Sequence, residues 1–424
     1  MNRMRTAAAL GVALLVGACT ATGKPHAASP AARTMPPAGP ADLLILRDGD
    51  GSDATPYAVV DVSEGRVLLR LPAGVPASDW HVLYSSHPSG ASTVVRAIDP
   101  MGGSVQREIS VAGDWRLPTI GLARVPGGLS ADGQTLVLEA ASAAGSGTGA
   151  TTRFAIVATE GKRAPREITL PGRFTFDALS PDGTLLYVIE HLTRSDYLVR
   201  QVDVRTGDLA AGAILDKRNV DERMAGYAAA QLPGADGWVY TVYRGEDGDF
   251  VHALDTQRGL AVCIDLPDTQ ATDEASAGHW GLALDATGRV LYAANGALGL
   301  VSEVSLDGFS VRTKALATEE PGLRLAKLAS DRAPSGGQVA ASPDGSTLYV
   351  LGERGVTSVA TSSLTPAARL GGDRTYRGLA LSADGALYVV DDAGAVSRLA
   401  ADGHVIATID RRDFSEIVAV LATR

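Results

Sequence analysis

Cysteine and basic residues are scarce in this sequence, and each shortage excludes a class of protein. The 424 residues include two cysteines, too few for a disulfide framework or a cysteine-rich zinc site. The 38 lysines and arginines are outnumbered by 48 aspartates and glutamates, which gives a formal net charge of −10. Because phosphate contacts need a surplus of basic side chains, we expect no nucleic-acid partner.

Motifs that announce catalysis or a metal are also missing. The sequence has no Gly-x-Ser-x-Gly nucleophile motif and no His-x-His or His-Glu-x-x-His spacing. The histidines are spread along the chain, so we expect no histidine-based metal site and no cofactor. Cys263 lies in the strand-like run LAVCIDL, which favours a buried, unreactive thiol.

The N-terminal segment MNRMRTAAALGVALLVGAC has the parts of a secretion signal. Arg3 and Arg5 give it a basic start, and residues 7–16 form an apolar segment too short to span a bilayer as a helix. Small residues then precede Cys19. This arrangement resembles the bacterial lipobox, and the resemblance implies cleavage before Cys19 and attachment of lipid to that cysteine. A plain secretory peptide with an incidental Cys19 is the alternative.

The composition changes after this signal. Residues 20–40 are rich in Ala, Pro, Ser and Thr and lack periodic apolar positions, which is typical of a flexible tether. We therefore expect a signal peptide at 1–18, the lipidated cysteine and tether at 19–40, and one globular domain at 41–424. No later apolar run approaches the roughly 20 residues of a transmembrane helix. The predicted location is the extracytoplasmic face of the cell membrane, at the cell surface or in the periplasm, with attachment through lipid.

The globular part repeats one pattern, in which a Ser-x-Asp-Gly turn is followed by an apolar strand that often contains Leu-Tyr-Val. The clearest copies are LSADGQTLVLEA (129–140), LSPDGTLLYVIE (179–190), LALDATGRVLYAAN (282–295), ASPDGSTLYVLGE (341–353) and LSADGALYVVDD (381–392). Asp-Gly supplies a tight turn, because glycine accepts a positive φ and aspartate bonds nearby backbone. Further strands follow each copy, and helical periodicity is almost absent.

Four antiparallel strands recurring every ~40–50 residues match the blade of a β-propeller. The Ser-Pro-Asp-Gly and Leu-Tyr-Val units resemble the bacterial YVTN/WD40-like propeller family over nearly all of residues 42–424. The Trp-Asp and Gly-His signatures of true WD40 repeats are not kept in register. We therefore predict an all-β propeller of four-stranded antiparallel blades.

The number of blades follows from counting one strand per blade, namely the second, which comes directly after the turn in the clear copies. The second strands are LLIL (43–46), HVLY (81–84), TLVL (135–138), LLYV (185–188), WVYT (238–241), VLYA (290–293), TLYV (347–350) and ALYV (386–389), which predicts eight blades. Seven blades result if residues 42–75 and 76–112 share one blade. The final run SEIVAVLATR (415–424) is a lone strand, and we expect it to complete the first blade, so that the N- and C-terminal strands close the ring.

Polar residues gather at one expected face of the ring. The second strands end in polar side chains, and long connections between blades (212–228, 266–280 and 316–336) emerge on the same side. The candidate residues for binding at the channel mouth are Glu190, His191, Arg244, Asn295, Arg354 and Asp391. Solvation of ordinary strand ends is the plainer explanation for the same residues.

These features favour a binding or scaffold module for a protein, peptide or glycan partner, and we expect a monomer. The alternative is a propeller enzyme, because propellers of similar repeat type include lactonases and quinone-dependent dehydrogenases. Glu190, His191, Arg244 and Asp391 are then the residues to suspect. A structural subunit of an envelope complex is a third possibility. An active site requires these groups to converge and to have perturbed pKa values.

Overall fold

The structure is a computed structural model. It describes residues 42–49, 57–121, 124–141, 149–216, 224–245, 248–267, 280–316, 338–352, 354–409 and 414–422. The chain divides into two compact units, Met1–Gly39 and Pro40–Arg424, and all described residues belong to the second. The predicted signal peptide, Cys19 and the tether lie outside the described residues. So do residues 217–223, 268–279 and 317–336 of the three long connections between blades.

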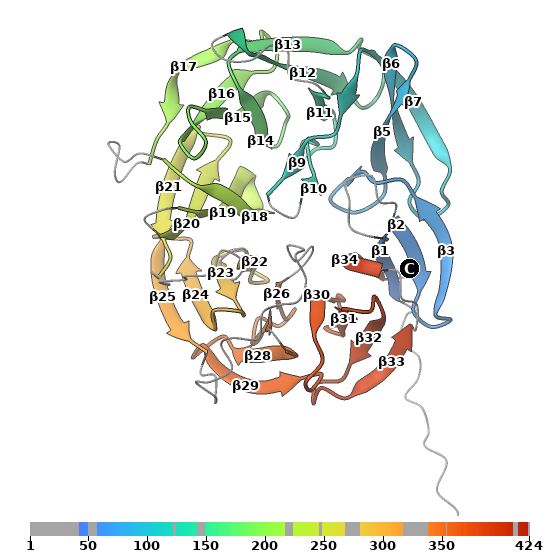
Figure 1. Ribbon diagram of the computed structural model, residues 1–424, viewed down its shortest axis with the longest axis vertical. Helices are drawn as coiled ribbons and strands as arrows, with labels where there is room; N and C mark the ends of the chain where they lie inside the picture. Colours follow the sequence, from blue (N-terminus) through green and yellow to red (C-terminus); the bar gives the residue numbers. More distant parts are fainter. Residues whose placement is uncertain are drawn as a thin grey trace, which may run out of the picture. The chain divides into compact units, whose positions relative to one another are not determined.

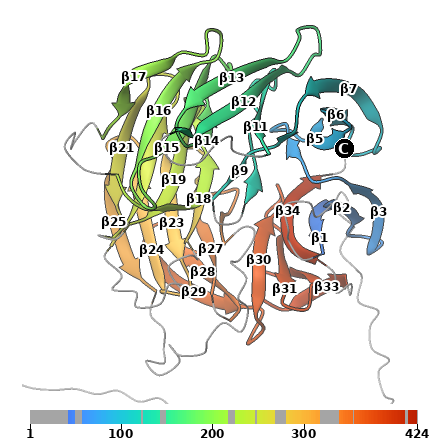
Figure 2. The ribbon, with the colours of Figure 1, turned by 45° about the horizontal axis from the view of Figure 1, so that its top comes forward.

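The described residues form eight four-stranded antiparallel sheets arranged as the blades of a propeller (Figures 1 and 2). From the innermost strand outwards, the first four blades are blade 1, β34 (Phe414–Ala422), β1 (Asp42–Asp48), β2 (Tyr57–Asp61) and β3 (Arg66–Leu71); blade 2, β4 (Val75–Pro76), β5 (Leu83–Ser89), β6 (Ser92–Ile98) and β7 (Val105–Ala112); blade 3, β8 (Trp115–Arg116), β11 (Thr135–Ala140), β12 (Thr151–Ala158) and β13 (Arg166–Pro171); and blade 4, β14 (Phe174–Leu179), β15 (Leu185–His191), β16 (Tyr197–Asp203) and β17 (Leu209–Ile214).

The last four blades follow the same scheme. They are blade 5, β18 (Tyr227–Pro233), β19 (Trp238–Arg244), β20 (Asp249–Asp255) and β21 (Leu260–Asp265); blade 6, β22 (Trp280–Leu284), β23 (Val290–Asn295), β24 (Leu300–Ser305) and β25 (Ser310–Ala315); blade 7, β26 (Val339–Ala341), β27 (Thr347–Leu351), β28 (Val356–Ala360) and β29 (Thr365–Leu370); and blade 8, β30 (Tyr376–Leu381), β31 (Leu387–Asp391), β32 (Val396–Leu399) and β33 (Val405–Ile409). A short 3₁₀ turn, η2 (Ala235–Gly237), precedes β19. The described residues contain no helix long and apolar enough to cross a membrane.

The predicted all-β propeller and its ring closure are confirmed. β34 pairs antiparallel with β1, from Asp42 opposite Ala422 to Asp48 opposite Phe414, so the chain's two ends share blade 1 (Figure 1). Blade 1 and blade 2 are separate sheets, which settles the number of blades at eight rather than seven. The pairing gives β1 an inner neighbour, so that this strand is not an open sheet edge.

The repeated turn links the first strand of a blade to its second, as the sequence predicts. In blade 4 the Ser180 hydroxyl donates to Asp182 at 2.6 Å and accepts a hydrogen bond from the Leu185 amide at 2.9 Å. Gly183 completes the turn with a φ of 66°. The Ser-x-Asp pairs of the other close copies make the same side-chain bond, at 130–132, 342–344 and 382–384.

The core lies between neighbouring blades, because a middle strand is covered on both faces. β15 is buried through Leu186, Tyr187, Val188 and Ile189, whereas every residue of the rim strand β25 is exposed. This difference explains why second strands are nearly continuous apolar runs and outer strands are not.

Blade 3 departs from the scheme at its inner strand. β8 pairs only with the end of β11, and a second sheet of two short strands, β9 (Thr119–Ile120) and β10 (Val125–Pro126), follows it. Pro118 precedes β9 and Pro126 is the last residue of β10, and proline cannot donate a hydrogen bond to a neighbouring strand. The hairpin extends toward the ring centre (Figure 1). A Cβ at Gly121 would lie 3.1 Å from the Ala229 carbonyl oxygen, so the hairpin packs against β18 of blade 5.

Candidate functional site

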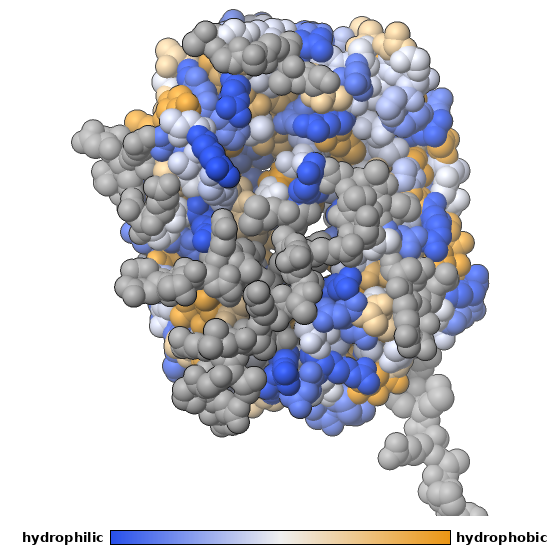
Figure 3. Space-filling view, in the orientation of Figure 1, coloured by the Kyte–Doolittle hydropathy of each residue, from blue (hydrophilic) through white to orange (hydrophobic). Residues whose placement is uncertain are grey.

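A cavity of about 1140 Å³ occupies the centre of the ring, and all eight blades contribute to its wall. The face of the propeller in Figure 3 is hollowed near its centre. The cavity runs along the inner strands, from Trp280 and Gln338 where two of these strands begin to Pro181 and Asp236 in the turns that follow two others. Its volume is slightly above the range of ordinary small-molecule sites, which are roughly 300–1,000 Å³.

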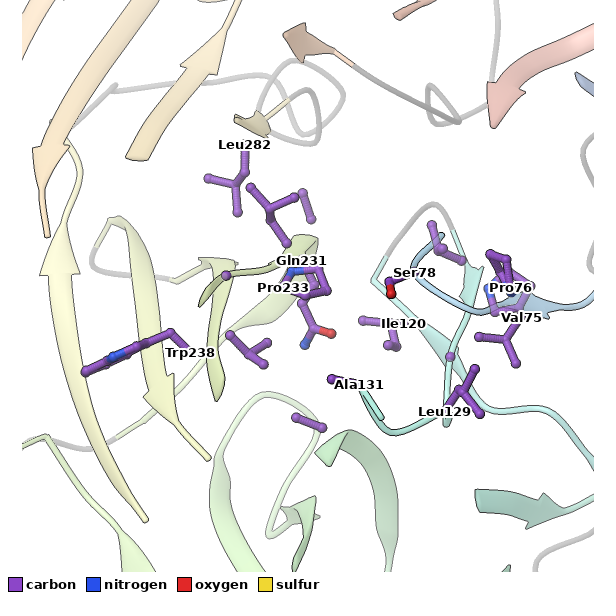
Figure 4. A pocket seen from close by; sticks show the side chains of 18 of the residues that line it. Val75, Pro76, Ser78, Ile120, Leu129, Ala131, Gln231, Pro233, Trp238 and Leu282 are labelled. Atoms are coloured by element: carbon purple, nitrogen blue, oxygen red, sulfur yellow. The ribbon is translucent and has the colours of Figure 1, made fainter. Parts of the chain in front are cut away.

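The wall is mainly apolar. Phe176 and Ala178 come from blade 4, Leu232 from blade 5 and Leu282 from blade 6, and Ile120 of the blade 3 hairpin also lines the cavity. Figure 4 shows Ile120 between Gln231 on one side and Val75 and Pro76 on the other. Apolar walls with a few placed polar groups are typical of ligand pockets.

One carboxyl group stands out in this wall. Asp177 lies in the inner strand β14, at a shift of register between Phe176 and Ala178 where β14 pairs with β15. Such bulges re-aim a side chain. The Gln231 side-chain amide, in β18 of the next blade, donates to the Asp177 carboxylate at 3.2 Å and to the Thr241 hydroxyl at 3.0 Å. The amide therefore joins blades 4 and 5 at the cavity wall.

Burial controls the electrostatics of Asp177. Loss of solvent raises the pKa of its carboxyl to about 7, against a smaller lowering by the Gln231 amide. Behind it lie Tyr197 and Tyr243, whose rings stack at 4.8 Å and whose pKa values are raised by burial. The described wall contains no lysine, arginine or histidine. The Asp177 carboxyl itself is fully buried beside the Gln231 amide.

A second carboxylate in the wall is already paired. Glu416 of β34 forms a buried ion pair with Arg47 of β1, at 2.9 Å between Oε2 and Nε. Burial raises the pKa of Glu416, and the Arg47 guanidinium opposes that rise. The positive partner compensates the Glu416 charge, whereas the hydrogen-bond donor to the Asp177 carboxyl is the neutral Gln231 amide.

Cys263 is buried, as predicted from its strand. Its Sγ lies 3.7 Å from Nδ1 of His252, and its backbone amide donates to Asp216 at 3.1 Å. Burial lowers the pKa of His252 to about 4, although Asp216 partly opposes this effect. His252 and Cys263 lie in the two outer strands of blade 5, Asp216 follows β17 of blade 4, and none of the three lines the cavity. Among the described residues, no group of three His, Cys, Asp or Glu side chains is arranged to hold a metal ion.

Three of the six predicted site residues lie at the ends of β15 and β19. Glu190 forms an ion pair with Arg200 of the next strand in its own blade. His191 Nε2 is 2.9 Å from the Thr175 hydroxyl, and burial lowers the pKa of this histidine, with a further contribution from Arg173. Arg244 lies close enough to Asp249 to oppose the rise that burial causes in the pKa of that carboxyl.

The other three predicted site residues lie at or next to the turns between the second and third strands of their blades. Asn295 is fully buried and its side-chain oxygen accepts a hydrogen bond from the Leu298 amide at 3.1 Å. Asp391 accepts one from the Ala395 amide at 2.9 Å, and the Arg354 carbonyl accepts one from Arg369 at 3.0 Å.

The structure spreads these six residues over five blades. None is among the described residues that line the cavity. A binding role for Glu190, His191, Arg244, Asn295, Arg354 and Asp391 stays a prediction.

Sequence reasoning missed Asp177 and Gln231. A usable signal was present, because Asp177 interrupts the otherwise apolar inner-strand run FTFDAL. An acidic residue inside a strand that faces a propeller channel deserves more weight than acidic residues at strand ends, which meet solvent in any blade.

Solved structures share this fold. NirN, solved as a dihydro-heme d1 dehydrogenase in complex with DHE, matches with a TM-score of 0.54 and 15% identity over 90% of this chain and 75% of that one. Apo AztD from Citrobacter koseri matches with a TM-score of 0.52 and 14% identity, over 91% and 100% of the two chains. BamB from Moraxella catarrhalis matches with a TM-score of 0.50 and 16% identity, over 81% and 89%.

These similarities establish the propeller fold, and fold alone does not select a function. No protein-family model matches the sequence, and no curated protein matches it. One of the three propellers is described as a dehydrogenase, so the fold is compatible with an enzyme as well as with a binding module.

Proposed function

We propose that this chain is a lipid-anchored, YVTN-like propeller at the extracytoplasmic face of the cell membrane, and that it acts as a binding or scaffold module. The observation that carries the binding role is the apolar cavity of about 1140 Å³ at the ring centre, with Asp177 and Gln231 in its wall. The lipobox-like residues before Cys19 support the anchor.

The partner in this proposal is a protein, peptide or glycan that reaches into the central cavity. The wall supports this assignment in two ways. Half-buried apolar residues such as Leu282 offer surface that a ligand can cover, and the side-chain amide of Gln231, which lies at the cavity (Figure 4), offers hydrogen bonds that fix its orientation. A wall built from all eight blades also keeps the site rigid.

Photo-crosslinking in the native host tests this function. A benzoylphenylalanine replaces Leu282 in the cavity wall of the full chain, and the matched control carries it at Ile406, which is 53% exposed on the rim strand β33. We expect an adduct of defined mass from position 282 and not from position 406. The same adducts at both positions, or none at 282, would contradict a binding role for the channel.

The anchor is tested in the same cells. Cys19→Ala in the full chain is expected to move the protein from the membrane fraction to the soluble fraction, because the cysteine that would carry the lipid is gone. Retention of the Cys19→Ala variant in membranes would count against lipid as the main attachment.

A further inference from the structure

Exposed apolar side chains gather on one side of the ring. Nine large apolar residues are exposed in the part of the chain that the structure describes, and five of these lie in three consecutive blades. They are Leu68 in blade 1, Met101 and Val105 in blade 2, and Val405 and Ile406 in blade 8. Single exposed apolar residues are ordinary on a protein surface, whereas a group of them marks a contact site.

These five residues share one edge of the ring. Met101 lies in the turn that joins β6 to β7, and the other four are among the first three residues of the rim strands β3, β7 and β33. The three rim strands follow one another around the ring (Figure 1). A Cβ at Gly103 in the blade 2 turn would lie 3.8 Å from Cδ1 of Leu69, so the turn with Met101 packs against the strand with Leu68. Because the turns between third and fourth strands lie at the same face of every blade, we call this group the apolar edge.

The fold does not require apolar residues at these places. The rim strand β13 of blade 3 begins with Arg166 and Glu167, and β29 of blade 7 begins with Thr365 and Pro366. Exposed apolar side chains in blades 8, 1 and 2 therefore point to a contact that is particular to this side of the ring.

The chain enters the propeller at the same edge. Asp42 is the first residue of β1, and its carbonyl accepts a hydrogen bond at 3.2 Å from the amide of Val62, in the turn between β2 and β3. The Asp42 carboxylate also accepts one from the Tyr388 hydroxyl of blade 8. Residues 20–41 separate Asp42 from Cys19, and a flexible coil of that length has a mean reach of about 25 Å. A membrane that holds lipid on Cys19 is therefore within reach of the apolar edge.

We propose that the apolar edge rests in the headgroup region of the membrane to which the chain is tethered, as a second contact beside the lipid. This inference rests on the proposed function, since the lipid on Cys19 brings the edge to the bilayer. Tethering makes the second contact intramolecular, so that a small apolar surface suffices although it would bind a membrane only weakly by itself.

The charges at the edge favour contact with apolar lipid over attraction to anionic headgroups. Residues 61–68, 99–105 and 400–406 make up the edge and contain four carboxylates but one arginine, Arg66, which pairs with Glu64. Anionic lipids attract clusters of lysine and arginine. The contact should therefore form on zwitterionic bilayers and persist in high salt.

Quenching by labelled lipid tests the contact in the intact lipoprotein. The full lipidated chain, in a Cys263→Ser background, carries bimane at Leu68→Cys or Met101→Cys and is placed in phosphatidylcholine vesicles that contain nitroxide-labelled phosphatidylcholine. The matched control is Val311→Cys, because Val311 is 40% exposed near the start of the rim strand β25 in blade 6. We expect quenching about threefold stronger at 68 and 101 than at 311, in low and high salt. Equal quenching at all three positions, none at 68 and 101, or quenching that high salt abolishes would overturn the inference.

A second variant assigns the contact to the apolar side chains. Leu68→Thr, Val405→Thr and Ile406→Thr together keep residues that suit a strand, and they are expected to remove most of the quenching of bimane at Met101→Cys. Unchanged quenching in this variant would exclude the apolar edge as the contact.

Flotation of the same vesicles separates this failure from failure of the proposed function. A chain that floats with the vesicles without quenching would leave the lipid anchor standing and remove only the apolar edge. A chain that does not float would count against the anchor and remove the edge with it. Position 406 faces lipid in this arrangement, so a lipid product there does not count as the partner adduct sought from position 282.

Discussion

Burial of the Asp177 carboxyl in the cavity wall has an electrostatic cost. This carboxyl is fully enclosed, and its hydrogen-bond donor is the amide of Gln231. Burial penalises the ionised form, which is why the pKa of this group rises to about 7 instead of remaining near its usual acidic value. Natural proteins retain such groups mainly where they serve a site.

This raised pKa predicts a pH dependence of stability. Between pH 4 and 7 the folded chain holds a proton on Asp177 that the unfolded chain has lost, so the free energy of unfolding falls as pH rises through this range. A shift of about three pKa units corresponds to at most about 4 kcal/mol in total. Above pH 7 that stability is gone.

Asp177→Asn removes this contribution. In urea titrations at several pH values we expect the variant to lose less stability than the natural chain between pH 4 and 7, and to be the more stable protein at pH 8. Glu139 and His252 titrate in both proteins, so the difference between the two curves reports Asp177. Parallel curves would show that the Asp177 carboxyl is ionised in the folded state throughout.

The predicted site residues show why single positions are hard to read from sequence. Second strands end at one face, so the placement of Glu190 and Asp391 at strand ends could be predicted. Their partners could not, because the choice of Arg200 for Glu190 and of the Ala395 amide for Asp391 depends on register and turn geometry. Polar residues at strand ends can therefore form hydrogen bonds or ion pairs within their own blade, and the sequence does not reveal these partners.

At the scale of elements, the repeated turn made the strands predictable. Serine, aspartate and glycine each have a separate task in the Ser-x-Asp-Gly turn, and all eight predicted second strands coincide with or overlap an observed strand. The hairpin of β9 and β10 escaped prediction because its strands are two residues each and have no periodicity to detect.

The closing strand β34 depends on a buried ion pair. Glu416 and Arg47 lie opposite each other in the pairing of β34 with β1, and both are almost inaccessible to solvent. Removing one member leaves the other charge buried without its partner, which costs about 3–5 kcal/mol. Exposed ion pairs contribute far less, because water competes for both charges.

Glu416→Ala is therefore expected to lower the free energy of unfolding by about 3–5 kcal/mol. The control is Glu108→Ala, which breaks a pair with Arg96 at 2.7 Å between two exposed side chains and should cost under about 1 kcal/mol. Chemical denaturation of both variants measures the difference. Similar losses would mean that the Glu416–Arg47 pair does not hold the ring closed.

At the scale of the molecule, ring closure creates the cavity. Eight blades bring eight inner strands around one axis, and the apolar residues of those strands face each other across a space of about 1140 Å³. The repeat pattern could predict the ring and its closure, because each copy specifies one blade. The cavity could not be predicted, since its width depends on the number of blades and on the hairpin of blade 3.

Photo-crosslinking from position 282 in the native host tests the central claim most directly, because it reports whether a partner enters the channel of the intact protein. We expect an adduct of defined mass from position 282 and none from position 406 on the rim strand β33. No adduct at position 282, or the same adducts at both positions, would contradict a binding role for the channel.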